Sequence, residues 1–129
     1  DNTKWEAKTL VAAFDWEMAG RDHLVLDIAV CVHAWCWRSD ERAYDADRCQ
    51  ALVAGYQSVR PLSPTEKRGL FVEAVFAAVR FTASRVRDFE VPRAGAPERS
   101  YLDYRDFAAR LDAIEALGPK PFRRLVGIA

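Results

Sequence analysis

Residues 14–20 read Phe-Asp-Trp-Glu-Met-Ala-Gly and directly follow two short segments with β propensity, residues 3–5 and 9–14. Glu6-Ala7-Lys8 separates the two segments, although this connection lacks the Gly or Asn that tight turns favour. Two such segments joined by a short connection predict a β-hairpin. The hairpin would end immediately before Asp15, so this aspartate would lead directly into a loop.

Asn2 and Asp15 stand at the two ends of the predicted hairpin. Antiparallel pairing brings the two ends of a hairpin together, so these side chains are expected to lie close to each other. Carboxylate and amide oxygens are hard ligands that suit magnesium. The residues alone leave two interpretations open. Asn2 and Asp15 share one magnesium ion, or Asp15 is an ordinary turn residue.

The chain beyond this loop is predicted to be helical. Residues 24–37 are apolar on almost every face, which is typical of a buried helix. Ser63-Pro64-Thr65-Glu66 forms a capping box with proline at the first helical position, and its helix is expected to run to about Asp88. Two further helices are expected at residues 46–59, capped by Asp45 and ended by Arg60-Pro61, and up to Leu117, capped by Ser100 and ended by Gly118-Pro119.

The predicted fold class is therefore mainly α, with a short β-hairpin followed by about four helices in a single domain over residues 1–129. Residues 91–99 contain Pro92, Gly95 and Pro97 and are expected to form a linker or loop. The tail beyond Gly118-Pro119 shows no clear period, so no helix is predicted there.

Composition excludes several classes of partner. The chain has 19 basic and 19 acidic residues and no net charge, which gives no electrostatic case for binding nucleic acid or an anionic membrane. No segment resembles a signal peptide or a bilayer span. The chain has three cysteines, an odd number that does not suggest the disulfide framework of a secreted protein. A cytoplasmic location is therefore expected. The chain opens on Asp1 without methionine, which suggests a piece of a longer protein.

Cys31, His33 and Cys36 raise the alternative of a zinc site. At about 100° per residue on a helix, these side chains point in different directions, and no fourth ligand is evident. Buried cysteines are the preferred interpretation. His33 as a catalytic base is disfavoured because it lies in a helix that is expected to be buried.

Each of two tryptophans and three arginines can be interpreted either as a structural residue or as a ligand-binding residue. Trp35 and Trp37 are predicted to be core residues, with a role in a ligand pocket as the alternative. Arg80, Arg85 and Arg87 are predicted to be solvated helix residues, with phosphate binding as the alternative.

A family resemblance adds to this interpretation. Phe-Asp-Trp-Glu-x-Ala-Gly at residues 14–20, followed by Asp27-Ile28-Ala29, resembles the metal-binding segment of the aminoglycoside phosphotransferase superfamily, whose fold is protein-kinase-like. Residues 32–37 resemble the Asn-Ala-Trp-Cys helix of the homoserine kinases in that superfamily, with His33 in place of Asn. Residues 51–62 resemble their Gly-Tyr-x-x-x-Arg-Pro-Leu segment.

The resemblance implies a role for three residues. Asp15 would be the main magnesium ligand and Asn2 the second, while Asp27 would support the backbone of the catalytic loop. The catalytic aspartate of the family would lie four positions upstream of Asp1, so no catalytic residue is expected within this chain. The ATP-holding lobe would lie further upstream, and this N-terminal lobe of the same protein is the expected partner.

The implied function is ATP-dependent and magnesium-dependent phosphoryl transfer to a small-molecule hydroxyl, with homoserine as the expected substrate and O-phosphohomoserine, an intermediate of threonine biosynthesis, as the product. Aminoglycosides or choline are alternative substrates. A non-catalytic helical interaction module, or a degenerate kinase lobe, is the alternative from another class. The 129-residue chain alone is expected to be inactive.

Overall fold

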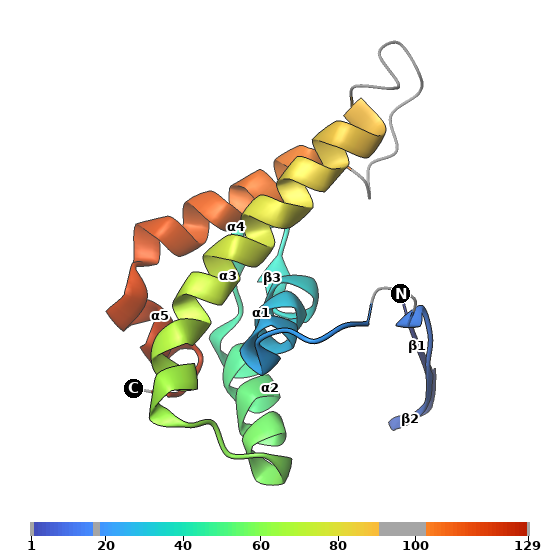
Figure 1. Ribbon diagram of the computed structural model, residues 1–129, viewed down its shortest axis with the longest axis vertical. Coiled ribbons are helices and arrows are strands. Elements are labelled where there is room, and N and C mark those ends of the chain that lie inside the picture. The colour runs from blue at the N-terminus through green and yellow to red at the C-terminus, as the bar shows by residue number, and fades with distance from the viewer. Residues whose placement is uncertain (1, 17–18, 91–102, 129) are drawn as a thin grey trace.

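The computed structural model describes residues 2–16, 19–90 and 103–128, and within them a two-stranded hairpin precedes five helices (Figure 1). The predicted fold class, mainly α with an N-terminal β-hairpin, is confirmed, with one helix more than expected. The elements are β1 (Thr3–Glu6), β2 (Thr9–Ala13), α1 (Leu24–Trp35), β3 (Trp37–Arg38), β4 (Ala43–Tyr44), α2 (Ala46–Val59), α3 (Pro64–Arg85), its π-helical continuation η2 (Val86–Glu90), α4 (Tyr104–Leu117) and α5 (Pro119–Leu125).

The hairpin pairs β1 with β2 in antiparallel register, from Thr3 opposite Ala13 to Glu6 opposite Thr9, with an irregularity between Lys4 and Trp5. Ala7 begins the two-residue turn with a φ of 53°. This left-handed conformation is the one that glycine adopts most readily, so the turn forms despite an unfavourable residue. In Figure 1 the backbone of the hairpin is separate from the helices, which we call together the helical body (α1 to α5), but the Trp5 ring of the hairpin lies 6.0 Å from the Trp35 ring of α1.

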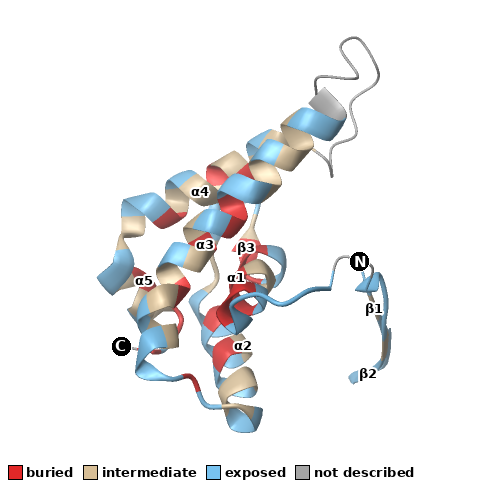
Figure 2. Ribbon diagram, viewed as in Figure 1, coloured by how far each residue is buried: buried red, intermediate tan, exposed pale blue. Residues whose placement is uncertain are grey.

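The helical body is built around α3, which packs against both α1 and α4 (Figure 1). Figure 2 shows the buried residues concentrated on α1 and on the inward faces of α3 and α4. The predicted buried helix over residues 24–37 is confirmed in part: α1 contributes Val25, Ile28 and Val32 to the core, but not all of its faces are buried. Leu24 and Trp35 are about half exposed, and the helix ends at Trp35 because residues 37 and 38 pair with β4 instead.

Local capping signals set most of the helix boundaries. The capping box between Ser63 and Glu66 is present, and the side chain of Asp45 accepts a hydrogen bond from Arg48 N, so both predicted caps are confirmed. The N-cap of α4 is Asp103, whereas the predicted cap Ser100 and the predicted linker 91–99 lie outside the described residues. Gly118, at a φ of 72°, ends α4 as expected.

Helix α5 was not predicted. Proline begins it, directly after the Gly118 that ends α4. Phe122, one of the seven residues of α5, is completely buried. The centroid of its ring lies 5.7 Å from that of Phe71 on α3. One buried aromatic residue, rather than a periodic stripe, therefore anchors this short helix on the core.

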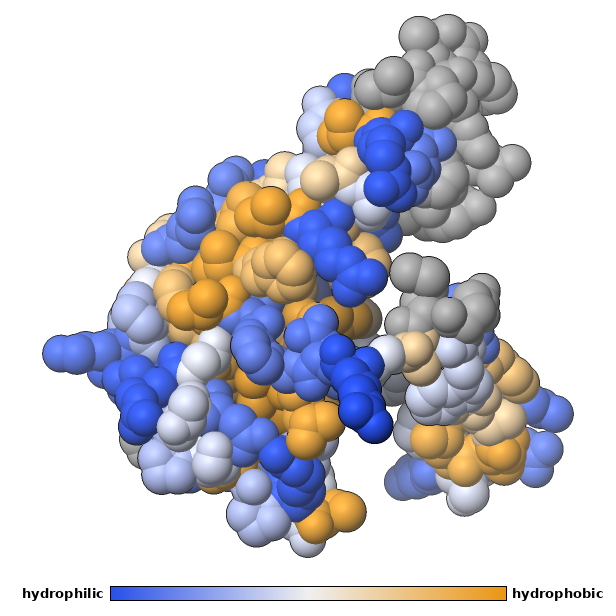
Figure 3. Space-filling view, viewed as in Figure 1, coloured by the Kyte–Doolittle hydropathy of each residue, from blue (hydrophilic) through white to orange (hydrophobic). Residues whose placement is uncertain are grey.

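Not all apolar side chains are buried. Figure 3 shows apolar surface along α3 and on the hairpin, and the exposed large residues on α3 include Val72, Phe76 and Val79. Among the described helices, none is both long enough and apolar enough to cross a bilayer.

Candidate active site

The hairpin places Asn2 and Asp15 in direct contact. The backbone N–H of Phe14 donates to the carbonyl oxygen of Asn2 at 2.8 Å, which continues the antiparallel pairing beyond the strands. The side-chain Nδ2 of Asn2 then donates to Oδ2 of Asp15, also at 2.8 Å. The expected proximity of these two residues is thus present, 13 positions apart in sequence, with both side chains exposed.

Asp15 has a φ of 67°, in the left-handed region that costs a residue with a side chain free energy. Aspartate tolerates this region better than most residues, but strain of this kind is concentrated at functional sites. The strained backbone turns the Asp15 carboxylate back across the hairpin end, toward Asn2.

The two side chains suit a magnesium ion in their chemistry. Together they offer carboxylate and amide oxygens, which are hard ligands. Magnesium is usually held by one or two protein groups, with water and substrate phosphates completing the shell. Within the described residues, no cluster of three or more His, Cys, Asp or Glu side chains could hold a metal. A site at Asn2 and Asp15 therefore fits magnesium bound together with nucleotide phosphates, rather than a closed all-protein site.

Asp27 lies in the first turn of α1 and is exposed. A carboxylate there interacts favourably with the positive end of the helix dipole. Within the described part of the chain its side chain has no hydrogen-bond partner, so its role in supporting a catalytic loop stays a prediction.

A cavity of about 830 Å³ lies between the hairpin and the helical body. This volume is within the range of roughly 300–1,000 Å³ that is typical of small-molecule sites. Its lining includes Asn2, Trp5, Trp35, Phe81, Arg85 and Arg110, from β1 or its flank, α1, α3 and α4. Asn2 thus belongs both to the contact with Asp15 and to the cavity wall.

The cavity decides which predictions for the two tryptophans and three arginines are confirmed. Trp37 is a core residue as predicted, but Trp35 lines the cavity, with its ring 6.0 Å from that of Trp5. Arg80 and Arg87 are exposed as predicted. The prediction that Arg85 is solvated is wrong, since α4 packs over its turn of α3 and half-buries its side chain.

His33 is a structural residue. Its Nε2 faces the carbonyl oxygen of Ala74 at 2.8 Å and must be the donor, so Nδ1 accepts from the hydroxyl of Tyr44, also at 2.8 Å. Burial lowers the pKa of His33 to about 4, which keeps the ring neutral. Both nitrogens are occupied, which argues against the alternatives of a zinc ligand and a catalytic base.

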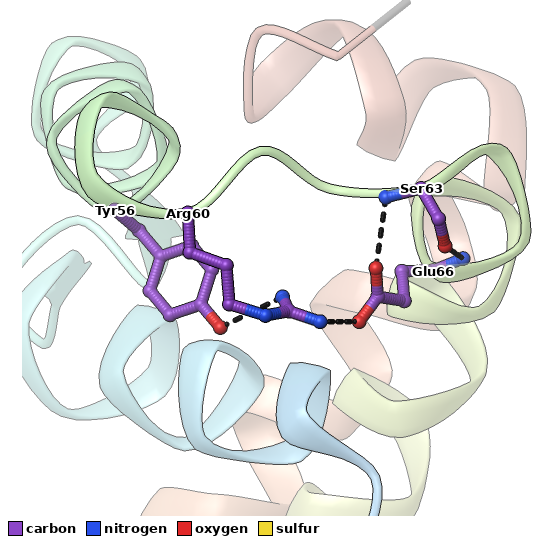
Figure 4. A network of polar contacts seen from close by, with 4 residues as sticks. All are labelled: Tyr56, Arg60, Ser63 and Glu66. Carbon is purple, nitrogen blue, oxygen red and sulfur yellow. Dashed lines mark hydrogen bonds and ion pairs between the residues drawn. The ribbon is translucent and has the colours of Figure 1, made fainter.

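The Gly-Tyr-x-x-x-Arg-Pro-Leu segment fixes the corner between α2 and α3 (Figure 4). Arg60 donates to the hydroxyl of Tyr56 at 3.0 Å and to the carboxylate of Glu66. The other Glu66 oxygen accepts from Ser63 N at 2.8 Å, which completes the capping box. The hydrogen bonds from Arg60 and then Ser63 lower the pKa of Glu66 to about 2. This motif is therefore a scaffold, and it lies outside the cavity lining.

Comparison with known proteins agrees with the resemblance found in the sequence. The chain is similar to proteins named homoserine kinase. It is 42% identical over 106 residues to the one from Gluconacetobacter diazotrophicus, a match that covers 81% of this chain and 33% of that protein. It is 40% identical to the one from Phenylobacterium zucineum and 41% identical to the one from Brucella melitensis biotype 2, each over 96 residues, 74% of this chain and 29% of the relative.

The chain thus spans about a third of the length of these curated homoserine kinases. No protein-family model matches it. The similarity extends over about three quarters of the chain or more, so it is not confined to one short motif.

Sequence reasoning missed Arg110 as a residue of the cavity. Arg110 lies three positions after Phe107, within the apolar stripe of α4, and its side chain follows that stripe into the cavity wall. A cation on the apolar side of an amphipathic helix was the available signal.

Proposed function

We propose that this chain is part of an ATP-dependent homoserine kinase, which transfers the terminal phosphate of ATP to the hydroxyl of homoserine and yields O-phosphohomoserine. The observation that carries the proposal is the contact between Asn2 and Asp15, in a chain about 40% identical to homoserine kinases. One carboxylate beside one amide group suits a magnesium ion whose remaining ligands are water and nucleotide phosphates.

In this proposal Asp15 is the main magnesium ligand and Asn2 the second. The Asn2 amide would turn its oxygen, rather than its nitrogen, toward the ion. Magnesium bound there would bridge the ATP phosphates and offset the charge that develops during in-line transfer. Asp27 would accept backbone hydrogen bonds from the catalytic loop.

The remainder of the proposed enzyme would lie outside the 129 residues, since the chain corresponds to about a third of its relatives. We propose that this chain is a C-terminal lobe of a protein-kinase-like fold. Another part of the protein would supply the ATP-binding lobe and the aspartate that orients the substrate hydroxyl. The product would enter threonine biosynthesis in the cytoplasm.

The test is a phosphorylation assay with the full-length protein encoded by the gene that carries this sequence. L-Homoserine, kanamycin and choline serve as acceptors, and ADP release with each is measured. We expect turnover with homoserine and at least 100-fold less with the other two. Turnover with kanamycin or choline instead would change the substrate assignment, and no turnover with any acceptor would support a non-catalytic module.

Asp15→Asn is the decisive variant in this assay, because asparagine keeps the shape of the side chain and tolerates a left-handed φ. It removes only the charge that would bind magnesium. We expect turnover to fall at least 100-fold. Asp112→Asn changes an exposed aspartate on α4, outside the cavity lining, and is the matched control, for which the rate should be unchanged.

A further inference from the structure

Two arginines from different helices converge on one buried ring at the cavity. The guanidinium carbons of Arg85 on α3 and Arg110 on α4 lie 4.1 Å and 4.2 Å from the centroid of the Phe107 ring. Phe107 is buried and stacks on Phe81 at 4.9 Å between ring centroids. The shared ring fixes both cations in place, since stacking on an aromatic face orients a guanidinium plane.

Both guanidinium groups have donors without acceptors. Nη2 of Arg110 donates to Asp106 at 2.6 Å, but its Nε is buried and has no hydrogen-bond partner among the described residues. Nη1 of Arg85 is likewise buried and has no hydrogen-bond partner among the described residues. Buried donors normally find acceptors, because a charged group that loses water without a replacement costs free energy. These two atoms are inaccessible to solvent, so a ligand in the cavity would meet the other nitrogens of the two guanidinium groups. Burial also lowers the pKa of both side chains.

The charged side chains that line the cavity leave a positive excess there. Asp106 offsets Arg110 through their ion pair, in which the Arg110 side chain is only 11% exposed. Within the described residues, Arg85 has no ion pair of its own. Asp103 and Asp106 also act on Arg85 from outside the cavity. The described residues that line the cavity include these two arginines and no acidic residue, beside an apolar surface that includes Trp5 and Trp35. An anion with one negative charge and several acceptor oxygens would complement this lining.

We propose that Arg85 and Arg110 form the subsite that holds the α-carboxylate of the amino-acid substrate. This inference rests on the proposed function and deepens it. A carboxylate matches the fork of an arginine with two parallel hydrogen bonds and a single charge. Asn2 lines the same cavity and contacts Asp15, so a substrate held by its carboxylate at Arg85 would extend toward the proposed magnesium pair.

The test compares two acceptors in the full-length protein, L-homoserine and 3-aminopropan-1-ol, which lacks the carboxylate. For the parent we expect homoserine to be preferred in kcat/KM. Arg85→Gln should raise KM for homoserine about 10- to 100-fold, as loss of a charge-assisted hydrogen bond implies. It should leave KM for ATP and the rate with 3-aminopropan-1-ol unchanged, so the preference collapses. Arg85→Lys should restore part of it.

Arg80→Gln is the matched control. It removes an exposed arginine one turn earlier on α3, outside the cavity lining, and should change neither KM. If Arg85→Gln raised KM for ATP alone, the anion would be a nucleotide phosphate and the carboxylate assignment would be wrong. If it lowered only the melting temperature, with the acceptor preference retained, Arg85 would be a structural residue and the proposal would fail.

Calorimetric binding of both acceptors separates this proposal from the proposed function. Homoserine binding that is lost in Arg85→Gln would support the carboxylate subsite even if the protein transferred no phosphate to homoserine. Absence of homoserine binding to the parent protein would overturn the subsite. Phosphorylation of homoserine with the same KM in Arg85→Gln and Arg110→Gln would overturn the subsite while leaving the kinase function intact.

Discussion

The helical body buries several of its large apolar side chains completely, whereas the strands of the hairpin bury none. Phe122, Leu70 and Ile114 of the body are completely inaccessible. Phe14 at the end of β2 is 50% exposed, and Trp16 just beyond it is 68% exposed. The body also exposes some large apolar side chains, such as Phe76 on α3, but only the body has a buried core.

This difference indicates which region can fold through its own contacts. The body joins α1, α2, α3 and α5 in one continuous buried cluster, to which Ile114 of α4 contributes. An isolated two-stranded hairpin is marginally stable in water, and this one contributes no buried residue. Large exposed apolar side chains mark interaction surfaces, and the hairpin has them without a buried core of its own.

The largest expected effect on stability is in the body. Phe122→Ala would leave a cavity under α5, at a cost of about 3–5 kcal/mol of unfolding free energy. Urea denaturation of the chain measures it. Phe76→Ala, at a half-exposed position on α3, is the control and should cost less than about 1 kcal/mol. Equal losses for the two variants would show that the body lacks the tight core described.

The next effect is pH dependence from His33. Its pKa is lowered from 6.5 to about 4 by burial, so the unfolded chain binds the proton more tightly. The stabilisation of the folded chain by neutral His33 is complete above pH 6.5. It is lost as the pH falls toward 4, which lowers the unfolding free energy by up to about 3 kcal/mol. Unfolding free energies of the parent and His33→Gln across this range isolate it, because other titrating groups affect both alike. Parallel profiles would contradict the neutral, buried histidine.

The smallest effect is expected in the hairpin. Phe14→Ala makes the same chemical change as Phe122→Ala, but at a half-exposed position, and should alter the unfolding free energy of the chain by less than about 0.5 kcal/mol. The same variant should reduce self-association in sedimentation velocity, because it removes exposed apolar surface. A loss as large as that of Phe122→Ala would mean that hairpin and body unfold as one unit.

Features set by neighbouring residues could be predicted from the sequence. The hairpin follows from two β segments, and the capping box follows from Ser63 and Glu66, three positions apart. The contact between Asn2 and Asp15 follows from pairing alone, because antiparallel strands bring their ends together. None of these features requires knowledge of what the helices pack against.

Features set by packing could not be predicted. Trp35 and Trp37 have the same local character, and only the β3–β4 pairing decides that one lines the cavity and the other is buried. Arg85 resembles the exposed Arg80 in sequence, and only the approach of α4 with Phe107 separates them. Helix α5 has a single anchoring residue, Phe122, and so gives no periodic signal.

The central claim is that Asp15 holds magnesium, and ligand-induced stabilisation of the full-length protein tests it most directly. Melting temperatures are measured with and without magnesium and ATP for the parent, Asp15→Asn and Asp27→Ala. Binding at 100 times Kd stabilises a protein by about 2.7 kcal/mol, so the parent should melt several degrees higher with the ligands.

We expect Asp15→Asn to melt at the parent temperature without ligands and to lose most of the shift with them. If Asp27 accepts hydrogen bonds from the catalytic loop, Asp27→Ala should melt lower than the parent, through roughly 1–3 kcal/mol of lost hydrogen bonding, and keep the shift. An Asp15→Asn protein with the full ligand-induced shift and the full rate of homoserine phosphorylation would contradict the metal assignment and remove the main support for a kinase from within this chain.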